Sequence, residues 1–204
     1  MKKQKHSASE RGITTVQDHV ATEIFLIRHA PVIPDGRVYG RRDIAADCSD
    51  SDHFARLRSA LPSMDRVLSS PAQRCIETSA AIWPDAKPVL EPALWEQDLG
   101  DWEGQPYANL PDLGPMDGPD LASFAPPNGE SFLDVCARVD PVLADLPPGK
   151  TAIVAHAGSI RAALSVALGG VPTALRFDIA NLSVTRVTKL QGGVFCINDV
   201  NRCI

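Results

Sequence analysis

Aromatic residues are scarce in this chain, and it has neither a long apolar run nor a large net charge. Phe, Trp and Tyr together make up 5% of its 204 residues. No apolar run approaches the roughly 20 residues that a membrane-spanning helix needs, so we expect no membrane partner. The formal net charge of −5 argues against wholesale nucleic-acid binding, which depends on basic surfaces.

Cysteine spacing also excludes two classes of protein. The cysteines are odd in number and widely scattered: Cys48, Cys75, Cys136, Cys196 and Cys203. A disulfide framework uses paired cysteines in an oxidising compartment, so this pattern predicts reduced thiols and a cytoplasmic protein. No CxxC or HExxH spacing occurs, and we therefore expect neither a metal site nor a cofactor.

Length and composition predict one globular domain with a sizeable core. Apolar residues account for 44% of the chain and charged residues for 22%, which is ordinary for a soluble protein. Residues 1–22 have a basic start without the apolar segment of a secretory signal, and we expect a flexible tail there. Residues 23–204 are expected to form a single domain, whose oligomeric state the sequence leaves open.

Short apolar segments alternate with helical segments along the chain. The predicted strands are residues 23–28, 66–69, 88–90 (extending toward Leu94), 151–155, 183–189 and 194–198. The first and fourth are apolar without alternation, as in strands buried on both faces of a parallel sheet. The last two are joined by a glycine-containing turn, as in a hairpin. The alternation predicts an α/β fold, a three-layer α/β/α sandwich with a mostly parallel central sheet.

Two helices are predicted directly after strands. Ser70 can cap a helix that has Pro71 in its first turn and runs to about Trp83. Another follows the strand at residues 151–155 and ends at about Leu168, before two consecutive glycines.

A third helix is predicted at residues 131–146. Ser131 and Asp134 have the spacing of a carboxylate variant of the capping box. Pro141 is expected to kink or interrupt this helix, because proline cannot donate the backbone hydrogen bond. The preceding residues 105–130 are rich in proline and glycine and predict a long excursion over the active-site edge, with one short helical turn.

Three chemically useful side chains are predicted to meet at one edge of the sheet. His29 and His156 each fall just past the end of a predicted strand, and Arg74 lies in the first turns of the helix after another. Ligands bind beyond the carboxyl ends of the strands in sheets of this kind. The topology alone therefore brings these residues together.

Four motifs occur in order along the chain. They are Arg28-His29-Ala30, the segment SSPAQRCIET at residues 69–78, Leu94-Trp95-Glu96 and His156-Ala157-Gly158. In these motifs the chain resembles the histidine phosphatase superfamily, in its phosphoglycerate mutase-like branch, over residues 23–201. The resemblance implies a phosphoglycerate mutase-like fold. Ala30 departs from the usual glycine and excludes backbone angles that only glycine adopts.

The resemblance implies phosphoryl transfer through a phosphohistidine, without a metal. His29 is then the nucleophile, because a neutral imidazole nitrogen can attack phosphorus directly. Arg28 and Arg74 are expected to clamp the nonbridging phosphate oxygens, since guanidinium groups match phosphate in geometry. His156 is expected to donate a hydrogen bond to the phosphoryl group.

An acid must protonate the leaving oxygen, and the family match selects Glu96 for this role. Spacing alone could not choose among the six neighbouring acids: Glu91, Glu96, Asp98, Asp101, Glu103 and Asp112. Glu103 is the second candidate, and we expect it to organise the loop.

The segment after His156 is predicted to add to the substrate site. Backbone N–H groups around Ala157, Gly158 and Ser159 open a helix and would bind an anion there. Arg161 is expected to form a surface ion pair instead of facing the pocket.

One segment after His29 bears on which phosphate ester is the substrate. The segment Tyr39-Gly40-Arg41-Arg42-Asp43 is similar to the α-ribazole phosphatase group, which acts late in cobalamin assembly. That resemblance makes Tyr39 and Arg41 substrate contacts, with Arg37 or Arg42 as a further candidate contact. An ordinary loop with solvated arginines is the alternative interpretation.

Basic residues are absent from positions 88–137. The ten acids in this stretch are Glu91, Glu96, Asp98, Asp101, Glu103, Asp112, Asp117, Asp120, Glu130 and Asp134. A lid drawn from this segment would repel a second phosphate or a carboxylate. The pattern favours a monophosphate on a neutral or weakly cationic body, on which Tyr39, Trp95, Trp102 or Tyr107 can stack.

Three functional hypotheses remain open from the sequence. The first is a metal-independent phosphomonoesterase acting on a small phosphate ester, with α-ribazole 5′-phosphate as the leading substrate. The second is the same chemistry on another ester, as in a broad-specificity or sugar-phosphate phosphatase or a mutase. The third is a non-catalytic binder of phosphorylated ligands, which the presence of all five catalytic candidates disfavours.

Overall fold

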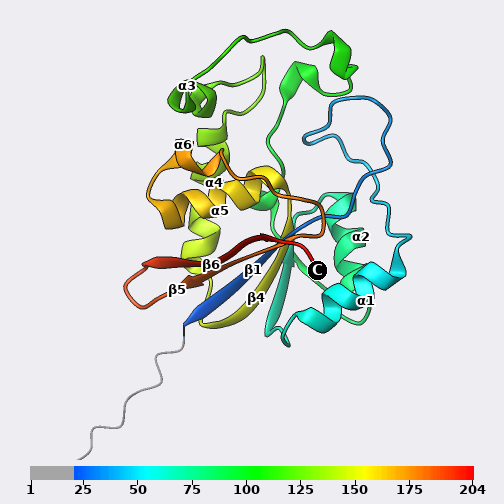
Figure 1. Ribbon diagram of the computed structural model, residues 1–204, viewed down its shortest axis with the longest axis vertical. Helices are drawn as coiled ribbons and strands as arrows, with labels where there is room; N and C mark the ends of the chain where they lie inside the picture. Colours follow the sequence, from blue (N-terminus) through cyan, green and yellow to red (C-terminus); the bar gives the residue numbers. More distant parts are fainter. Residues whose placement is uncertain (1–20) are drawn as a thin grey trace, which may run out of the picture.

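The computed structural model describes residues 21–204, which form a central sheet between two layers of helices (Figure 1). The predicted tail lies outside the described residues except for Ala21 and Thr22, and Thr22 already belongs to the first strand. No helix within residues 21–204 has both the length and the apolar character needed to cross a membrane.

The sheet has six strands in the order β3-β2-β4-β1-β5-β6. Their bounds are β1 Thr22–Arg28, β2 Arg66–Ser69, β3 Val89–Leu90, β4 Gly149–Ala155, β5 Val184–Lys189 and β6 Phe195–Arg202. The first four in spatial order are parallel, while β5 runs antiparallel to β1 and β6 antiparallel to β5. The predicted α/β fold with a mostly parallel sheet is therefore confirmed.

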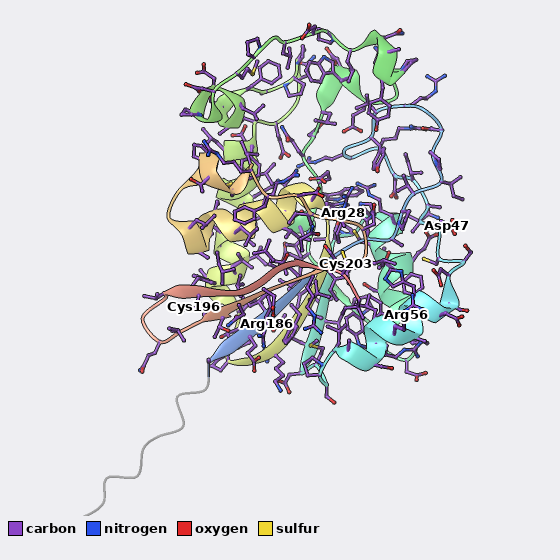
Figure 2. All side chains as sticks on the ribbon, viewed as in Figure 1. Arg28, Asp47, Arg56, Arg186, Cys196 and Cys203 are labelled. Atoms are coloured by element: carbon purple, nitrogen blue, oxygen red, sulfur yellow. The ribbon has the colours of Figure 1, made fainter. Side chains whose placement is uncertain are left out.

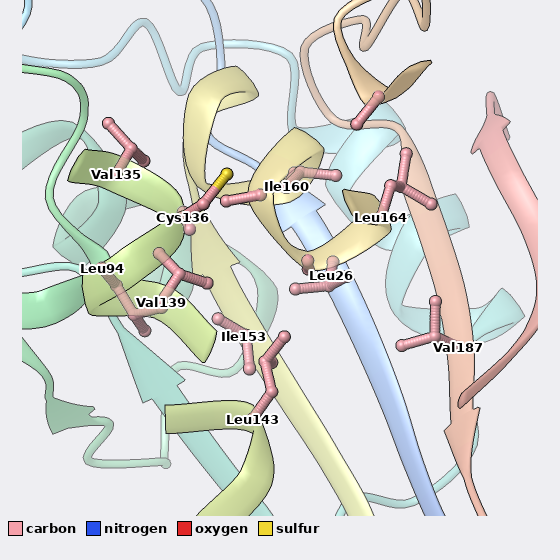
Figure 3. Packing of buried hydrophobic residues seen from close by; sticks show 14 of the residues in the cluster. Leu26, Leu94, Val135, Cys136, Val139, Leu143, Ile153, Ile160, Leu164 and Val187 are labelled. Atoms are coloured by element: carbon pink, nitrogen blue, oxygen red, sulfur yellow. The ribbon is translucent and has the colours of Figure 1, made fainter. Parts of the chain in front are cut away.

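Alternate residues of the central strands face opposite helix layers. The helices are α1 Ser51–Ala60, α2 Gln73–Ile82, α3 Gly118–Ser123, α4 Phe132–Asp145, α5 Ala157–Leu168 and α6 Val171–Ala174. Leu26 and Ile153 pack with the apolar residues of α4 and α5 (Figure 3), whereas Phe25 and Ile27 pack with those of α1 and α2. Burial of both sheet faces explains the uninterrupted apolar runs of β1 and β4.

The helix ends follow the local sequence in some places and depart from it in others. Ser131 and Asp134 form the predicted capping box at the start of α4. The helix α5 ends at Gly169, whose φ of 65° suits glycine. The predicted interruption at Pro141 is wrong, because α4 continues through it to Asp145.

The predicted cap at Ser70 is also wrong. The N-cap of α2 is Ala72, and Pro71 precedes the helix. Ser70 Oγ instead accepts the Ala72 N–H at 3.3 Å and faces His156. The expected extension of the third strand fails as well, because Pro92 opens a 3₁₀ turn at Pro92–Leu94.

The helix α1 is an element that the sequence analysis missed. Asp50 caps it by accepting the His53 N–H at 2.9 Å, and Phe54 and Leu57 are its buried residues. A cap followed by two apolar residues three apart is a usable signal. The helix is short and otherwise polar, which makes that signal weak.

The predicted excursion lies beyond the carboxyl ends of β1 and β4 (Figure 1). It contains α3 and a 3₁₀ turn at Tyr107–Asn109, one helical piece more than expected. Phe124 of the excursion stacks on Trp102, which precedes it, with ring centroids 5.7 Å apart. Aromatic packing therefore joins the excursion to the residues before it, above the edge where the site residues meet.

Candidate active site

The sheet brings His29 and His156 together, as the topology predicts. His29 follows β1 and His156 follows β4, and these strands are parallel neighbours in which Arg28 pairs with Ala155. The two imidazole rings lie edge to face with centroids 5.2 Å apart. Arg74, on the first turn of α2, donates from Nε to His156 Nδ1 at 3.3 Å. Residues distant in sequence therefore form one cluster.

Hydrogen bonding determines which nitrogen of His29 carries its proton. His29 Nδ1 lies 2.7 Å from the Ala30 carbonyl oxygen. A carbonyl oxygen only accepts, so Nδ1 is the protonated nitrogen of the neutral ring. The other nitrogen, Nε2, therefore keeps its lone pair.

The environment of His29 also sets its charge. Burial, together with the positive charges of Arg74 and Arg28, lowers the pKa of His29 to about 3. The ring is 2% exposed. It is therefore neutral near pH 7, which is the form a nitrogen nucleophile requires.

Two side chains hold the backbone around His29. Asn181 Nδ2 donates to the His29 carbonyl oxygen at 2.8 Å. The Ala30 N–H donates to Thr78 Oγ1 at 2.9 Å, and that hydroxyl donates to the Arg74 carbonyl oxygen at 2.7 Å. Thr78 belongs to the motif at residues 69–78, and the structure gives it this role. Asn181 was not predicted, because an asparagine in a loop before a strand gives no sequence signal.

Arg74 is fully buried, and protein acceptors bind only some of its N–H donors. Besides His156, its guanidinium donates to the carbonyl oxygens of Gly40 at 2.7 Å and Arg42 at 3.1 Å. The ring of Tyr39 lies 5.4 Å from its central carbon. These contacts use three of the five N–H groups of a guanidinium, so two can face an anion.

Arg28 is the second cation of the cluster. One of its terminal nitrogens donates to the Ile179 carbonyl oxygen. Its Nε is buried and has no hydrogen-bond partner within residues 21–204. A buried guanidinium nitrogen without a partner is costly unless a ligand supplies an acceptor. The predicted phosphate contact of Arg28 fits this arrangement.

His156 is fully buried, and both of its ring nitrogens contact protein groups. Arg74 Nε donates to Nδ1, which places the proton of the neutral ring on Nε2, and Ser70 Oγ accepts from Nε2 at 2.9 Å. Burial and the charge of Arg74 lower the pKa of His156 well below its ordinary value. Trp95 stacks on the ring, with centroids 6.3 Å apart. Its predicted role as a donor to the phosphoryl group stays a prediction.

The carboxylate of Glu96 lies at the start of α5, where the anion site was expected. The N–H of Gly158 donates to Glu96 Oε1 at 3.1 Å, and the Gln97 N–H donates to the same oxygen at 3.0 Å. An anion is favoured at a helix N-terminus, and here the carboxylate of Glu96 takes that place. The expected phosphate contact of Gly158 is thus replaced by Glu96. Ala157 is the first residue of α5, beside His156.

Glu103 organises the loop, as the sequence analysis expected. Its Oε1 accepts the N–H of Arg41 at 2.7 Å and that of Leu99 at 3.1 Å, and Oε2 accepts the N–H of Arg42. These bonds join the loop after His29 to the residues just before the excursion. Glu103 therefore holds this loop in place.

The arginines predicted as substrate contacts have protein partners. Arg41 Nη2 donates to Glu130 Oε1 at 2.7 Å, and Nη1 lies 3.8 Å from Asp98. Arg42 pairs with Asp35. The structure gives no direct support to substrate contact by Arg41.

Arg161 differs from its expected surface ion pair. Its Nε donates to the Phe177 carbonyl oxygen at 2.8 Å. No carboxylate within residues 21–204 forms an ion pair with it. The side chain thus holds the chain after α6 against α5.

A cavity of about 310 Å³ lies beside the loop that follows His29. One of its lining residues, Asn181, donates to the His29 carbonyl oxygen. Its lining residues are Pro31, Val32, Pro34, Asp35, Gly36, Arg37, Tyr39, Tyr107 and Asn181. The two tyrosines and Arg37, whose Nη1 donates to the Gly104 carbonyl oxygen at 2.7 Å, give it aromatic and cationic walls.

Comparison with known proteins agrees with this geometry. A family model described as the histidine phosphatase superfamily (branch 1) matches residues 24–201. Bifunctional protein Rv2228c of Mycobacterium tuberculosis is 34% identical over 134 residues, 58% of this chain and 36% of the relative. Glucosyl-3-phosphoglycerate phosphatase of the same organism is 31% identical over 143 residues, 62% of this chain and 64% of the relative. The chain thus spans 36% of the length of the first curated relatives that it matches.

Solved structures share the fold over nearly the whole described chain. The mycobacterial glucosyl-3-phosphoglycerate phosphatase Rv2419c has a TM-score of 0.77 at 21% identity, covering 89% of this chain and 99% of that one. A provisionally assigned α-ribazole-5′-P phosphatase of Escherichia coli has a TM-score of 0.72 at 22% identity, covering 89% and 96%. The family model covers the whole motif set, and we conclude that the chain belongs to the histidine phosphatase superfamily.

Proposed function

We propose that this protein is a phosphomonoesterase that hydrolyses small phosphate esters through a phosphohistidine at His29. The observation that carries the proposal is the hydrogen bond from His29 Nδ1 to the Ala30 carbonyl oxygen. It leaves Nε2 unprotonated on a ring that burial keeps neutral. Arg28 and Arg74 lie close enough to lower the pKa of that ring, so attack on a bound phosphate begins beside two cations.

The first step transfers the phosphoryl group to the enzyme. His29 Nε2 attacks phosphorus, a nitrogen–phosphorus bond forms, and the bond from phosphorus to the ester oxygen breaks. Arg28 and Arg74 stabilise charge on the nonbridging oxygens, which is the main contribution a protein makes to such a reaction. Glu96 enters this step protonated and gives its proton to the leaving oxygen.

The second step returns the enzyme to its starting state. Water attacks the phosphorus of phosphohistidine and loses a proton to the carboxylate of Glu96. The nitrogen–phosphorus bond breaks, which releases phosphate and neutral His29. Side chains supply every group in both steps, so we expect activity to persist in the presence of a chelator.

α-Ribazole 5′-phosphate is the leading substrate. Tyr39 and Tyr107 line the cavity beside the loop that follows His29. Aromatic faces suit a nucleoside-like body, because flat rings stack on them. The likeness of residues 39–43 to the α-ribazole phosphatase group supports the same choice.

A phosphoglycerate ester is the second candidate. The 31% identical relative is a glucosyl-3-phosphoglycerate phosphatase. In addition, Arg37 lines the cavity and is a cation available to a carboxylate. The acid-rich stretch is a weaker argument against a second anionic group than the sequence suggests, because Arg138 and Arg41 both pair with Glu130.

The test is phosphate release from a panel of esters by wild type and by His29→Ala, with chelator present. The panel holds α-ribazole 5′-phosphate, glucosyl-3-phosphoglycerate, 3-phosphoglycerate, phosphoserine and p-nitrophenyl phosphate. His53→Ala, a substitution on α1 outside the site, is the matched control. Rapid quenching in alkali, in which phosphohistidine survives, tests for a phosphoenzyme.

The panel separates the candidates. Preference for the ribazole ester supports the leading substrate, and preference for a glycerate ester replaces it with the second. His29→Ala should abolish both turnover and the alkali-stable phosphoenzyme. Unchanged hydrolysis by that purified variant would overturn the proposed mechanism.

A further inference from the structure

The proposed acid, Glu96, sits on a segment that has little regular structure to hold it. Residues 93–96 follow the start of a 3₁₀ turn, Pro92–Leu94, and belong to no strand. Their backbone carbonyl groups therefore need hydrogen-bond donors from elsewhere. Side chains from two other helices, α4 and α5, meet this need.

Arg138 on α4 supplies most of these hydrogen bonds. Its Nη1 donates to the carbonyl oxygens of Ala93 at 2.6 Å and Trp95 at 2.7 Å. Its Nη2 donates to the carbonyl oxygen of Glu96 at 3.0 Å. Ser159 Oγ on α5 donates to the remaining carbonyl, that of Leu94, at 3.0 Å. Four consecutive carbonyls are thus bonded by side chains.

Glu130 holds the guanidinium of Arg138 in place. Arg138 donates from Nε to Glu130 Oε1 at 3.1 Å and from Nη2 to Oε2 at 2.9 Å. With the three carbonyl contacts, these bonds occupy all five N–H donors of the guanidinium. Glu130 also accepts the Asp98 N–H at 3.0 Å and a bond from Arg41 at 2.7 Å.

The surroundings of Glu130 favour its charged form, which is the form that pairs with Arg138. Burial acts to raise its pKa, but the hydrogen bonds from Arg138 and the Asp98 N–H outweigh burial, and the pKa lies below its ordinary value. The side chain of Arg138 is only 17% exposed. A shielded two-point ion pair keeps its geometry far better than a solvated one.

We propose that Arg138, held by Glu130, is a positioning residue that sets where Glu96 meets the leaving oxygen of the substrate. The inference rests on the proposed role of Glu96 as the acid. One end of Glu96 is held through its carboxylate on Gly158, and Arg138 holds the other end through the main chain. A shift of the main chain would move the carboxylate away from the reacting oxygen, to which proton transfer is sensitive.

The test compares two leaving groups. The oxygen of p-nitrophenyl phosphate leaves as a stable phenolate and needs little help from an acid, whereas that of β-glycerol phosphate leaves as an alcohol and needs a proton. For Arg138→Met we expect the rate of His29 phosphorylation, measured in a single turnover, to fall by about 100-fold with the glycerol ester and by a few-fold with the aryl ester. Hydrolysis of the phosphohistidine, in which Glu96 takes a proton from water, is the same for both esters, so the comparison is made on the first step. The substrate concentration that gives half the maximal rate should change little, because the phosphate contacts remain.

Two further variants sharpen the comparison. Arg138→Lys keeps the charge with three donors in place of five, so its loss on the glycerol ester should be smaller. Arg186→Met is the matched control. Arg186 is a β5 arginine that pairs with Asp199 and Glu23, and Figure 2 shows it apart from Arg28. The control should leave the ratio of the two phosphorylation rates at the wild-type value.

Glu96→Gln separates failure of this inference from failure of the proposed function. If Glu96→Gln slows phosphorylation of His29 equally with both esters, Glu96 is not the acid and the proposed mechanism fails. If Glu96→Gln is selective for the glycerol ester but Arg138→Met slows phosphorylation equally with both esters, only the positioning role fails. If Arg138→Met does not fold, Glu130→Gln is the second variant, because it weakens the bonds that hold Arg138 in place. We expect the same selective loss from it.

Discussion

Glu96 Oε1 accepts the N–H of Gly158 at 3.1 Å, and glycine is what allows the carboxylate to come so close. A Cβ built on Gly158 would lie 2.2 Å from that oxygen, well inside van der Waals contact. The glycine of the His156-Ala157-Gly158 motif thus makes room for the proposed acid. This contact joins two motifs that are far apart in the chain.

Gly158→Ala should therefore displace Glu96 and remove acid catalysis. We expect phosphorylation of His29 by an alkyl phosphate, followed in a single turnover, to slow by about 100-fold and that by an aryl phosphate much less. Gly170→Ala is the control beyond the other end of α5, because the nearest atom to its added Cβ would be Thr173 Oγ1 at 3.7 Å. Wild-type activity on the alkyl ester in Gly158→Ala would contradict the assignment of Glu96.

Thr78 should be required for the orientation of His29. Thr78→Val removes the hydroxyl that accepts the Ala30 N–H and leaves that N–H buried without a partner. The expected cost is about 1–3 kcal/mol in the free energy of unfolding. Phosphorylation of His29, followed in a single turnover, should slow by up to about 100-fold, because the nucleophile shifts.

Two variants test whether that effect belongs to the hydroxyl of Thr78. Thr78→Ser retains it and should restore most of the phosphorylation rate. Ser79→Ala is the matched control, because the buried Ser79 hydroxyl has no hydrogen-bond partner within residues 21–204. Equal rates in Thr78→Val and wild type would show that the Ala30 contact is dispensable.

Arg74→Lys should lower turnover although the charge is kept. A lysine cannot bond the Gly40 and Arg42 carbonyls and still present a fork to phosphate. We expect kcat/KM to fall by about 100- to 1000-fold, as when a donor to the transition state is lost. Arg66→Lys, which removes an arginine bonded to Pro147, Pro148 and Thr151, is the control. A wild-type kcat/KM in Arg74→Lys would rule out the proposed binding of the phosphate oxygens by the Arg74 guanidinium.

The buried neutral His29 should make stability depend on pH. Its pKa is about 3 in the folded chain against an ordinary value of 6.5, so below pH 6.5 the unfolded chain binds the proton more readily. Stability therefore falls as the pH drops, and one such group costs about 2 kcal/mol at pH 5 relative to pH 7. His29→Asn should lose less stability than wild type by about that amount, measured by urea unfolding at both pH values. An identical loss in both proteins would show that His29 is not held neutral.

Much of the fold follows from local patterns. The apolar runs of β1 and β4 and the capping box of Ser131 and Asp134 are short-range features, and each is found where it was predicted. Predictions failed where tertiary contacts competed with local preference. Ser70 is a good helix cap by type, but its hydroxyl accepts from His156, a residue 86 positions away.

The sequence by itself determined which residues gather at the site. Parallel strands end at a common edge, so His29 and His156 meet there whatever the loops do, and the helix after β2 brings Arg74 to them. Their chemistry also follows from residue type, because an imidazole beside guanidinium groups combines a nucleophile with phosphate binding.

Only the tertiary structure decided how the surrounding charges are used. Arg41 was expected to contact substrate, but it pairs with Glu130, 89 residues away. The carboxylate of Glu96 occupies the helix N-terminus that was expected to bind phosphate, and Arg138 binds the main chain of the segment that contains Glu96. Such pairings depend on distances between segments far apart in the chain, and local sequence carries no information about those distances.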